Sequence, residues 1–365
     1  MSEPSRARAL YVTRRSKGGP HAGDQVHVRR MLAFLESRID LNVLELEPLG
    51  KAGRIGNLLR AWPIEMTGFY GSSNVERLNA AIAEHRPDVV YLIHEALFPF
   101  ADHIDGPQVV LFCMNAISCL AETDPAISVR ITAPIARRYE NRFFRSAAAR
   151  TLILVSRADA QWFRGLWHVD KPFPIAAPGA LRPVPLGEDA GVSPEMLITG
   201  SYAWWRKRRD LKEFASHDLD MRVLVTDPLA AEILGDRASL IELKTQDFGN
   251  ALRFGMVTDR FLGGFKLKSL EYVANNAVVL SRSDIRPDYH GLPDAKLFVR
   301  FTPEIDDVKA AVAEIRSLPP SEVIARFRAF QSCCTARFEW DACLQPLLPP
   351  FLPNPDLDDL MSPVA

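Results

Sequence analysis

The chain has 365 residues, of which 47% are hydrophobic and 24% are charged. This length is too great for one ordinary core and predicts two domains, each with enough apolar residues to form its own core. Lysine and arginine together number 44 against 45 acidic residues, which gives a formal net charge of -1. Such a balance excludes a general attraction to nucleic acid, so any anionic ligand must be bound by local charges.

Neither a membrane span nor a secretory leader is predicted. Apolar stretches such as 109–114 fall far short of the roughly 20 residues that a membrane span needs. The basic residues of the first eight positions are not followed by an apolar segment. The five cysteines include no C-x-x-C pair, which favours reduced, buried thiols over disulfides or a zinc site. We therefore expect a cytoplasmic protein.

The first half of the chain alternates strand-like and helical patterns. Apolar runs predict strands at 10–12, 41–46, 89–93, 109–113 and 152–155. Apolar residues at helical spacing predict helices around 28–35, 75–85 and 131–144. This alternation is typical of βαβ units and a parallel sheet.

A segment rich in proline and glycine, 172–194, divides the chain and is predicted to be a linker, because proline disrupts helices and central strands. Strand patterns then resume at 196–199, 222–225, 240–243, 255–257, 277–280 and 297–299. Helices are expected at 304–317 and 321–343, and the tail 349–365 is expected to be poorly ordered. Two such domains would place a ligand cleft at the carboxyl ends of their strands.

The most informative motif runs from Thr258 to Glu271 and reads TDRFLGGFKLKSLE. A strand ends there in a Gly-Gly loop in front of a helix, where backbone N–H groups can bind a phosphate closely. Lys266 and Lys268 oppose the helix dipole unless both bind an anion. Glu271 lies between one and two turns further on, where its carboxylate can accept ribose hydroxyls. The alternative is a solvated lysine pair at an ordinary loop–helix junction.

This motif, followed by the strand AVVLS at 277–281, resembles the nucleotide-binding region of retaining GT-B glycosyltransferases of the family 4 type, also called glycosyl transferases group 1. The resemblance implies that Lys266 binds the donor diphosphate and that Glu271 binds the ribose. It places five neighbours in the donor site as well: Arg260, Gly264, Phe265, Lys268 and Ser269. The family often has a further glutamate, which contacts the donor sugar, where this chain has Gly263.

Further stretches of the chain resemble motifs of the family, and they occur in the same order as in the family. The run LITGSYAWWRK at 197–207 resembles the opening of the second domain, which presents a basic residue to the diphosphate. Arg206 and Lys207 are the candidates, and Lys207 is preferred. For Trp204 and Trp205 we favour core or hinge packing over stacking on a base or sugar. The run LILVSRAD at 152–159 resembles the strand and capped helix before the linker.

In the first domain, the segment SKGGPHAGDQVH at 16–27 resembles the glycine-rich loop on the acceptor side. Its Gly18 and Gly19 would let the backbone reach the donor phosphates. Asp24 is interpreted as a helix N-cap, with a sugar hydroxyl as the alternative ligand. His94 and Glu95 lie just past the strand 89–93, and either would contact acceptor or sugar; the alternative is that His94 is a structural histidine.

The implied fold is α/β with GT-B architecture, in which two Rossmann-like domains with parallel sheets face a central cleft. Residues 1–180 form the acceptor-binding domain and 181–331 the nucleotide-sugar-binding domain. The sequence RFEW at 337–340 resembles the signature of a C-terminal helix that crosses back. We therefore expect about 332–347 to pack on the first domain.

The implied activity is transfer of a sugar from a UDP- or GDP-linked donor to a glycan or glycoconjugate acceptor, with retention, in polysaccharide or glycoconjugate biosynthesis. No cofactor and no metal are expected, because the Asp-x-Asp triplets at 218–220 and 356–358 do not follow strands. The basic run at 206–209 is a solvated helix face or contacts the inner face of an anionic membrane. The sequence does not predict an oligomeric state.

Two other functions are compatible with the sequence. A sugar-nucleotide epimerase of GT-B type would need carboxylates and histidines in the cleft, and no obvious set is visible. A descendant that binds a nucleotide or glycan without catalysis is suggested by Gly263. ATPase, dehydrogenase, zincin and lipase functions lack their motifs.

Overall fold

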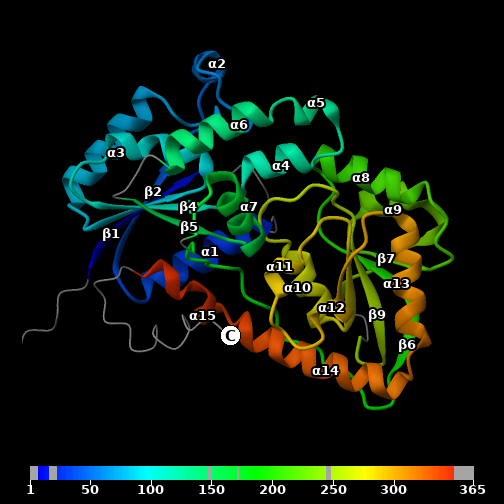
Figure 1. Cartoon of the computed structure of the whole chain (residues 1–365). Coiled ribbons are helices and arrows are strands. Elements are labelled where there is room, and N and C mark those ends of the chain that lie inside the picture. The colour runs from blue at the N-terminus through cyan, green and yellow to red at the C-terminus, as the bar shows by residue number, and fades with distance from the viewer. Residues whose placement is uncertain (1–6, 16–22, 146–149, 171, 244–247, 349–365) are drawn as a thin grey trace, which may run out of the picture.

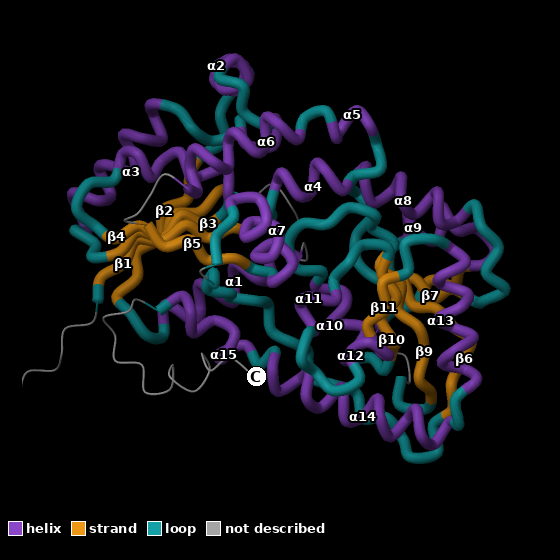
Figure 2. Tube along the Cα trace, viewed as in Figure 1, coloured by secondary structure: helices purple, strands orange, loops and turns teal. Residues whose placement is uncertain are grey.

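The computed structural model describes residues 7–15, 23–145, 150–170, 172–243 and 248–348. Two α/β domains lie side by side, each built on a wholly parallel sheet (Figures 1 and 2). The strand order is β2-β1-β3-β4-β5 in the first sheet and β11-β10-β9-β6-β7-β8 in the second. The predicted fold class is confirmed.

The strands of the first sheet are β1 (Arg8–Arg14), β2 (Asp40–Leu46), β3 (Val89–Ile93), β4 (Gln108–Cys113) and β5 (Arg150–Leu154). Its domain contains the helices α1 (Gly23–Glu36), α2 (Lys51–Leu59), α3 (Ser72–His85), α4 (Ile117–Thr123), α5 (Ile127–Arg130), α6 (Ala133–Glu140) and α7 (Arg157–Trp167).

The strands of the second sheet are β6 (Gly191–Ile198), β7 (Val223–Val225), β8 (Ala238–Leu240), β9 (Ala251–Val257), β10 (Ala277–Ser281) and β11 (Val299–Phe301). The helices after β6 are α8 (Trp205–Ala215), α9 (Pro228–Leu234), α10 (Leu267–Ala274), α11 (Arg286–Tyr289), α12 (Ala295–Phe298), α13 (Ile305–Ser317), α14 (Pro320–Arg337) and α15 (Trp340–Leu344).

The first sheet is buried on both faces. In β1, Leu10 and Val12 belong to one core and Ala9 and Tyr11 to the other, because successive side chains of a strand point to opposite faces. Burial on both faces accounts for the continuous apolar runs that predicted these strands. The second domain has a core of its own, which includes the strand residues Val278 to Leu280.

Three predicted boundaries in the second half are wrong. The linker ends earlier, because β6 begins at Gly191 and includes Pro194. Proline is tolerated there because the pairing with β9 shifts register between Val192 and Met196. The strand predicted at 240–243 is β8, which ends at Leu240, and the strand predicted at 297–299 is mostly the short helix α12.

The C-terminal helix crosses back to the first domain, but later than predicted. Apolar residues of α14 up to Phe338 still pack in the core of the second domain. The short helix α15 then lies against α1, where Asp341 forms an ion pair of 2.7 Å with Arg38. Tyr91 donates a hydrogen bond of 2.7 Å to the carbonyl oxygen of Leu347.

The prediction that all cysteines are buried is also wrong, since Cys333 is exposed. The predicted tail lies outside the described residues.

Candidate donor-binding site between the domains

Two lysines of the predicted motif share one carboxylate between β9 and α10. Lys266 immediately precedes α10, and its Nζ lies 3.9 Å from Oδ2 of Asp259. The Nζ of Lys268 donates a hydrogen bond of 3.1 Å to Oδ1 of the same residue. Both lysine side chains are less than 10% exposed, at 7% and 9%. The alternative of a solvated lysine pair is therefore wrong.

Three lysines act on the carboxylate of Asp259 at this point. Burial lowers the pKa of Lys266 to about 8, Asp259 opposes this shift, and the nearby charge of Lys207 adds to it. Burial would also raise the pKa of Asp259, but Lys268, Lys207 and Lys266 together hold it below its usual range. A lysine whose pKa stays low beside a carboxylate would be stabilised in its charged form by a further anion.

The two glycines of the motif touch the first domain. Gly264 has a φ of +65°, and its N–H donates a hydrogen bond of 2.9 Å to Oδ2 of Asp159. A Cβ at this position would lie 2.5 Å from the carbonyl oxygen of Met114, so only glycine fits. Gly263 has a φ of +141°, and a Cβ there would lie 3.2 Å from the Cβ of Leu120. The glutamate that the family often has would be strained and crowded at position 263 in this conformation.

Three other residues predicted to bind the donor lie in α10 or in the loop before it. Glu271 is half-buried; burial raises the pKa of its carboxyl, while Thr199 and Lys268 oppose that shift. The hydroxyl of Ser269 donates a hydrogen bond of 2.6 Å to the carbonyl oxygen of Lys266, which fixes the loop–helix junction. Phe265 packs against the cores of both domains.

The remaining basic candidates make other ion pairs. Arg206 is buried, and its guanidinium lies 3.2 Å from Glu65 and 3.5 Å from Asp124, both in the first domain. Arg260 lies 3.7 Å from Glu213 and 3.6 Å from Glu304. A diphosphate would have to compete with these carboxylates. Of the two candidates on α8, Lys207 is the one whose charge lowers the pKa of Lys266 and of Asp259.

Core packing of the tryptophans before and at the start of α8, one of the two kinds of packing that we favoured, is wrong. Trp204 is 37% exposed and Trp205 is 48% exposed. The guanidinium of Arg206 lies over both rings, at 5.1 and 5.4 Å from their centroids. The edge-on contact of Trp204 with Phe261 joins this pair to the loop of the donor motif.

Three buried carboxylates of the first domain bind backbone N–H groups at the start of α4. They come from separate elements, and each accepts a hydrogen bond from a backbone N–H: Glu95 from Asn115, Asp159 from Ala116 and Glu140 from Ser118. Burial raises the pKa of Glu95 to about 7, of Asp159 to about 6 and of Glu140 to about 8. Because Asp159 also binds Gly264, these carboxylates lie next to the donor motif.

The other candidates in the first domain are His94, Asp24, Gly18 and Gly19, and the structure describes only the first two. His94 ends β3 with a φ of +99°, and its Nδ1 accepts a hydrogen bond from the N–H of Ala96 and lies 3.1 Å from Glu95. Burial lowers the pKa of this histidine, as does the charge of Arg14, and both favour its neutral form. Since α1 begins at Gly23, Asp24 lies in the first turn and is not the N-cap as predicted. Gly18 and Gly19 lie outside the described residues.

The sequence interpretation missed two residues that organise this site. Asp259 directly follows Thr258 beyond the end of β9, and this position at a strand carboxyl end was an available signal. Asp159 lies in the first turn of α7, where an acidic residue is ordinary. Its contact with Gly264, 105 positions away, has no signal in the sequence.

Two negative findings concern the described part of the chain alone. It contains no group of three His, Cys, Asp or Glu residues arranged to hold a metal ion. None of its helices is long and apolar enough to span a membrane.

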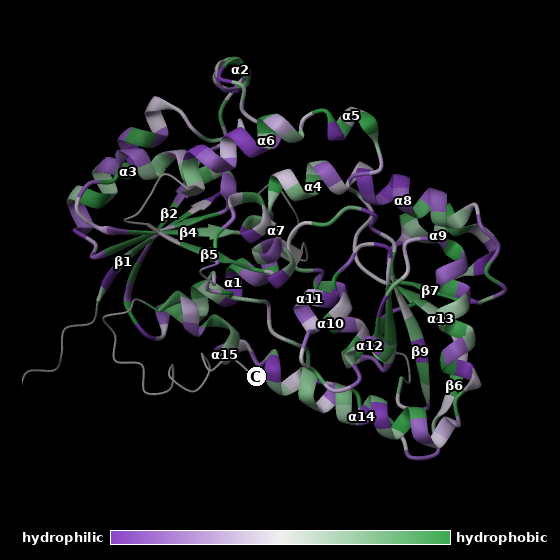
Figure 3. Ribbon diagram, in the orientation of Figure 1, coloured by the Kyte–Doolittle hydropathy of each residue, from purple (hydrophilic) through white to green (hydrophobic). Residues whose placement is uncertain are grey.

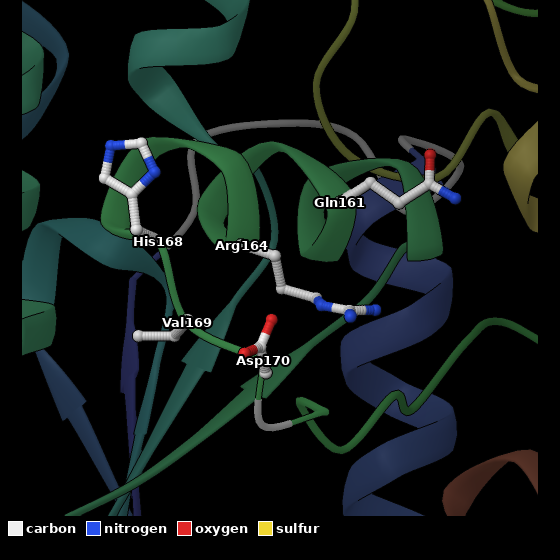
Figure 4. A pocket seen from close by; sticks show the side chains of 5 residues that line it. All are labelled: Gln161, Arg164, His168, Val169 and Asp170. Atoms are coloured by element: carbon white, nitrogen blue, oxygen red, sulfur yellow. The ribbon is translucent and has the colours of Figure 1, made fainter.

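A polar pocket of about 520 Å³ lies at the far end of α7, lined by Gln161, Arg164, His168, Val169 and Asp170 (Figure 4). None of the predicted site residues lines it.

Most of the chain is similar to solved structures, although no family model and no curated protein matches it. A sucrose-phosphate synthase from Thermosynechococcus elongatus superposes with a TM-score of 0.61 at 14% identity, over 94% of this chain and 97% of that one. Anabaena HepE in complex with UDP gives 0.57 at 12% identity, over 93% and 98%. The lipopolysaccharide outer core galactosyltransferase WaaB gives 0.56 at 12% identity, over 93% and 98%.

The chain has the GT-B fold. At these identities the likeness concerns the arrangement of the two domains, and the residues of the site must be argued from their own contacts. In this arrangement the Gly-Gly loop before α10 lies against the first domain. That is where Gly264 meets Asp159.

Proposed function

We propose that this chain is a glycosyltransferase that moves a sugar from a UDP- or GDP-linked donor to a glycan or glycoconjugate acceptor. The observation that carries the proposal is the buried pair Lys266 and Lys268 sharing Asp259 beside a Gly-Gly loop, with the charge of Lys207 close by. A nucleotide diphosphate would bring negative charge next to these lysines and stabilise Lys266 in its charged form. Support also comes from the neighbours, one of which binds UDP and one of which is described as a galactosyltransferase.

Charge stabilisation is the chemistry that these residues offer. As the bond between the sugar and the diphosphate breaks, negative charge builds up on the leaving group. Lys266 and Lys207 would stabilise that charge without a metal ion, as preorganised cations in a buried site can do. We name no protein nucleophile, and retention of configuration is proposed from the family resemblance alone.

Donor binding would require a rearrangement of one contact. The N–H of Gly264, which the resemblance assigns to the donor site, is bound to Asp159 in this structure. A donor phosphate would replace this carboxylate, and the two domains would separate locally at the loop. We therefore propose that Asp159 competes with the donor for the N–H of Gly264.

The first experiment is a thermal-shift screen of the full chain with nucleoside diphosphates and nucleotide sugars, since a ligand that binds the folded state raises its melting temperature. We expect UDP or GDP to raise it, and Lys266→Ala to abolish the increase. Transfer of sugar to glycan acceptors is then followed by mass spectrometry. No shift with any nucleotide would contradict the proposed donor class.

The two alternative functions predict different products. A binding protein without catalysis would show the thermal shift but neither transfer nor donor hydrolysis, and it remains an alternative because of Gly263. An epimerase would convert the nucleotide sugar without any acceptor, and the neighbours give no support for it. Cytoplasmic location and a role in polysaccharide or glycoconjugate biosynthesis stay predictions.

A further inference from the structure

Two tryptophans at the start of α8 keep their rings exposed at the boundary between the domains. Trp204 is 37% exposed and Trp205 is 48% exposed, although a side chain of this size is usually well buried. Arg206, whose guanidinium lies over both rings, pairs with Glu65 and Asp124 of the first domain. Figures 1 and 3 show the largely hydrophilic helix α8 beside α4 of that domain. The rings are therefore held by ion pairs that cross the domain boundary.

The contacts of the donor motif place these rings at one end of its lysine pair. At the other end, the charge of Lys268 lowers the pKa of Glu271, the residue proposed to bind the ribose. On the tryptophan side, Nζ of Lys266 lies 4.5 Å from the centroid of the Phe261 ring, which packs edge-on against Trp204 with centroids 5.0 Å apart. In a nucleotide sugar the diphosphate separates the nucleoside from the sugar. The base would thus lie away from the tryptophans and the sugar toward them.

The two arginines that contact these rings are already paired with carboxylates. Arg209 lies over the Trp205 ring and pairs with Asp124 at 2.6 Å and with Asp210 at 2.7 Å. An anionic ligand would have to compete with these ion pairs, and a protein partner would need a far larger surface than two rings. A pyranose needs neither, because its C–H face can stack on an aromatic ring while polar groups at the rim bind its hydroxyls.

We propose that Trp204 and Trp205 form a stacking platform for a pyranose ring of the acceptor, and that Glu65 accepts a hydrogen bond from one of its hydroxyls. The Glu65 side chain is 46% exposed and belongs to the domain that the resemblance assigns to the acceptor. The donor sugar is bonded directly to the diphosphate and would lie at Lys266, whereas the exposed rings lie beyond Phe261. This inference rests on the proposed transferase function, which fixes the direction of the donor.

Saturation-transfer NMR tests the platform without requiring turnover. Transfer from the full chain is measured to the methyl glycosides of glucose, galactose and mannose in both anomers, with mannitol as a polyol that has no ring. We expect transfer to a pyranoside, strongest at its ring C–H protons, and none to mannitol. Trp204→Leu and Trp205→Leu should each raise the Kd by about tenfold or more, because leucine is apolar but has no flat face. Trp205→Phe should raise it by less than about threefold.

Two further variants complete the test. Glu65→Gln should raise the Kd by about threefold, because a neutral amide oxygen is a weaker acceptor than a carboxylate. The matched control is Phe301→Leu at the end of β11, where the ring is also 37% exposed and has the guanidinium of Arg286 over it at 5.3 Å. This control should bind the pyranoside as the parent does. Melting temperatures establish that the variants are folded and, with UDP or GDP added, that they bind the donor.

Each outcome decides the proposal. If UDP or GDP raises the melting temperature but no pyranoside binds, the platform is overturned and the transferase proposal stands. The platform is also overturned if the tryptophan variants bind the pyranoside as the parent does, if Phe301→Leu loses as much binding as they do, or if they lose the nucleotide-induced shift, which would place the base on the rings. Pyranoside binding that needs both tryptophans, without any nucleotide shift, would contradict the transferase proposal alone. Absence of both kinds of binding would overturn both proposals.

Discussion

The N-terminal ends of α4 and α10 face each other across the domain interface and carry opposite charges. At α4, three carboxylates of the first domain already bind the backbone N–H groups of Asn115, Ala116 and Ser118. At α10, the residues are cationic, and two lysines share Asp259. The first helix end is therefore supplied with anions by its own domain, whereas the second carries the lysines of the motif next to Asp259.

This difference indicates which side would bind an anionic donor. Additional negative charge near α4 would meet Glu95, Asp159 and Glu140, which are already destabilised as anions by burial. Additional negative charge near α10 would stabilise Lys266 in its charged form. Asp159 connects the two ends because it accepts hydrogen bonds from Ala116 and from Gly264. The following predictions separate the contributions of the two ends.

The largest effect is expected from Lys266→Ala. If this lysine stabilises the leaving diphosphate, its removal should lower turnover by about a hundredfold or more. The matched control is Lys309→Ala, an exposed position on α13, which should leave the rate unchanged. Steady-state rates and melting temperatures of both variants check this prediction. Near-normal turnover in Lys266→Ala would remove the lysine from the donor site.

Gly264→Ala tests the contact between the two helix ends. The new Cβ would lie 2.5 Å from the carbonyl oxygen of Met114 at a φ of +65°, so the loop must move away from the first domain. We expect a loss of stability of about 1–3 kcal/mol and a fall in activity of about tenfold.

The control for that variant is Gly165→Ala. This glycine lies within α7, has no atom within 4 Å of an added Cβ, and should tolerate alanine or gain stability from it. Urea unfolding measures both variants. Equal stability of the two variants would mean that the loop moves freely and that the interface at Gly264 is weak.

The residues that come together at the start of α10 could be predicted from the sequence, whereas most of those at the start of α4 could not. Lys266, Lys268 and Gly264 form a local motif whose spacing carries its own chemistry. The carboxylates at α4 come from three elements that only the folded sheet brings together. The ion pairs of Arg206 with Glu65 and Asp124 could not be predicted for the same reason, because they join residues far apart in the sequence across two domains.

A smaller effect concerns the dependence of stability on pH. Burial raises the pKa of Glu140 to about 8, so the folded state favours the protonated carboxyl. The resulting stability is fully present below the pKa of the unfolded state, near 4.5, and is lost as pH rises through about 8. Between pH 5 and pH 9 we expect the melting temperature to fall by on the order of 5 °C.

Glu140→Gln should make that pH profile shallower, because glutamine cannot ionise but still accepts a hydrogen bond from the N–H of Ser118. The remaining slope comes from Glu95 and Asp159, whose pKa values burial also raises. The control is Glu84→Gln, an exposed position on α3, which should keep the pH dependence of the parent. Melting curves across the pH range check both variants. A profile of Glu140→Gln as steep as that of the parent would show that this carboxyl does not titrate between the two states.

The smallest effect is expected from a chelator. If the lysines at α10 neutralise the leaving group, EDTA should change the rate of transfer by less than about twofold, since no carboxylate pair is then needed to hold a cation on the diphosphate. The triplet at Asp218–Asp220 precedes β7 and so lies at the amino end of that strand, away from the edge where ligands of parallel sheets bind. A rate that falls with EDTA and returns with Mg²⁺ or Mn²⁺ would mean that the charge at α10 is insufficient.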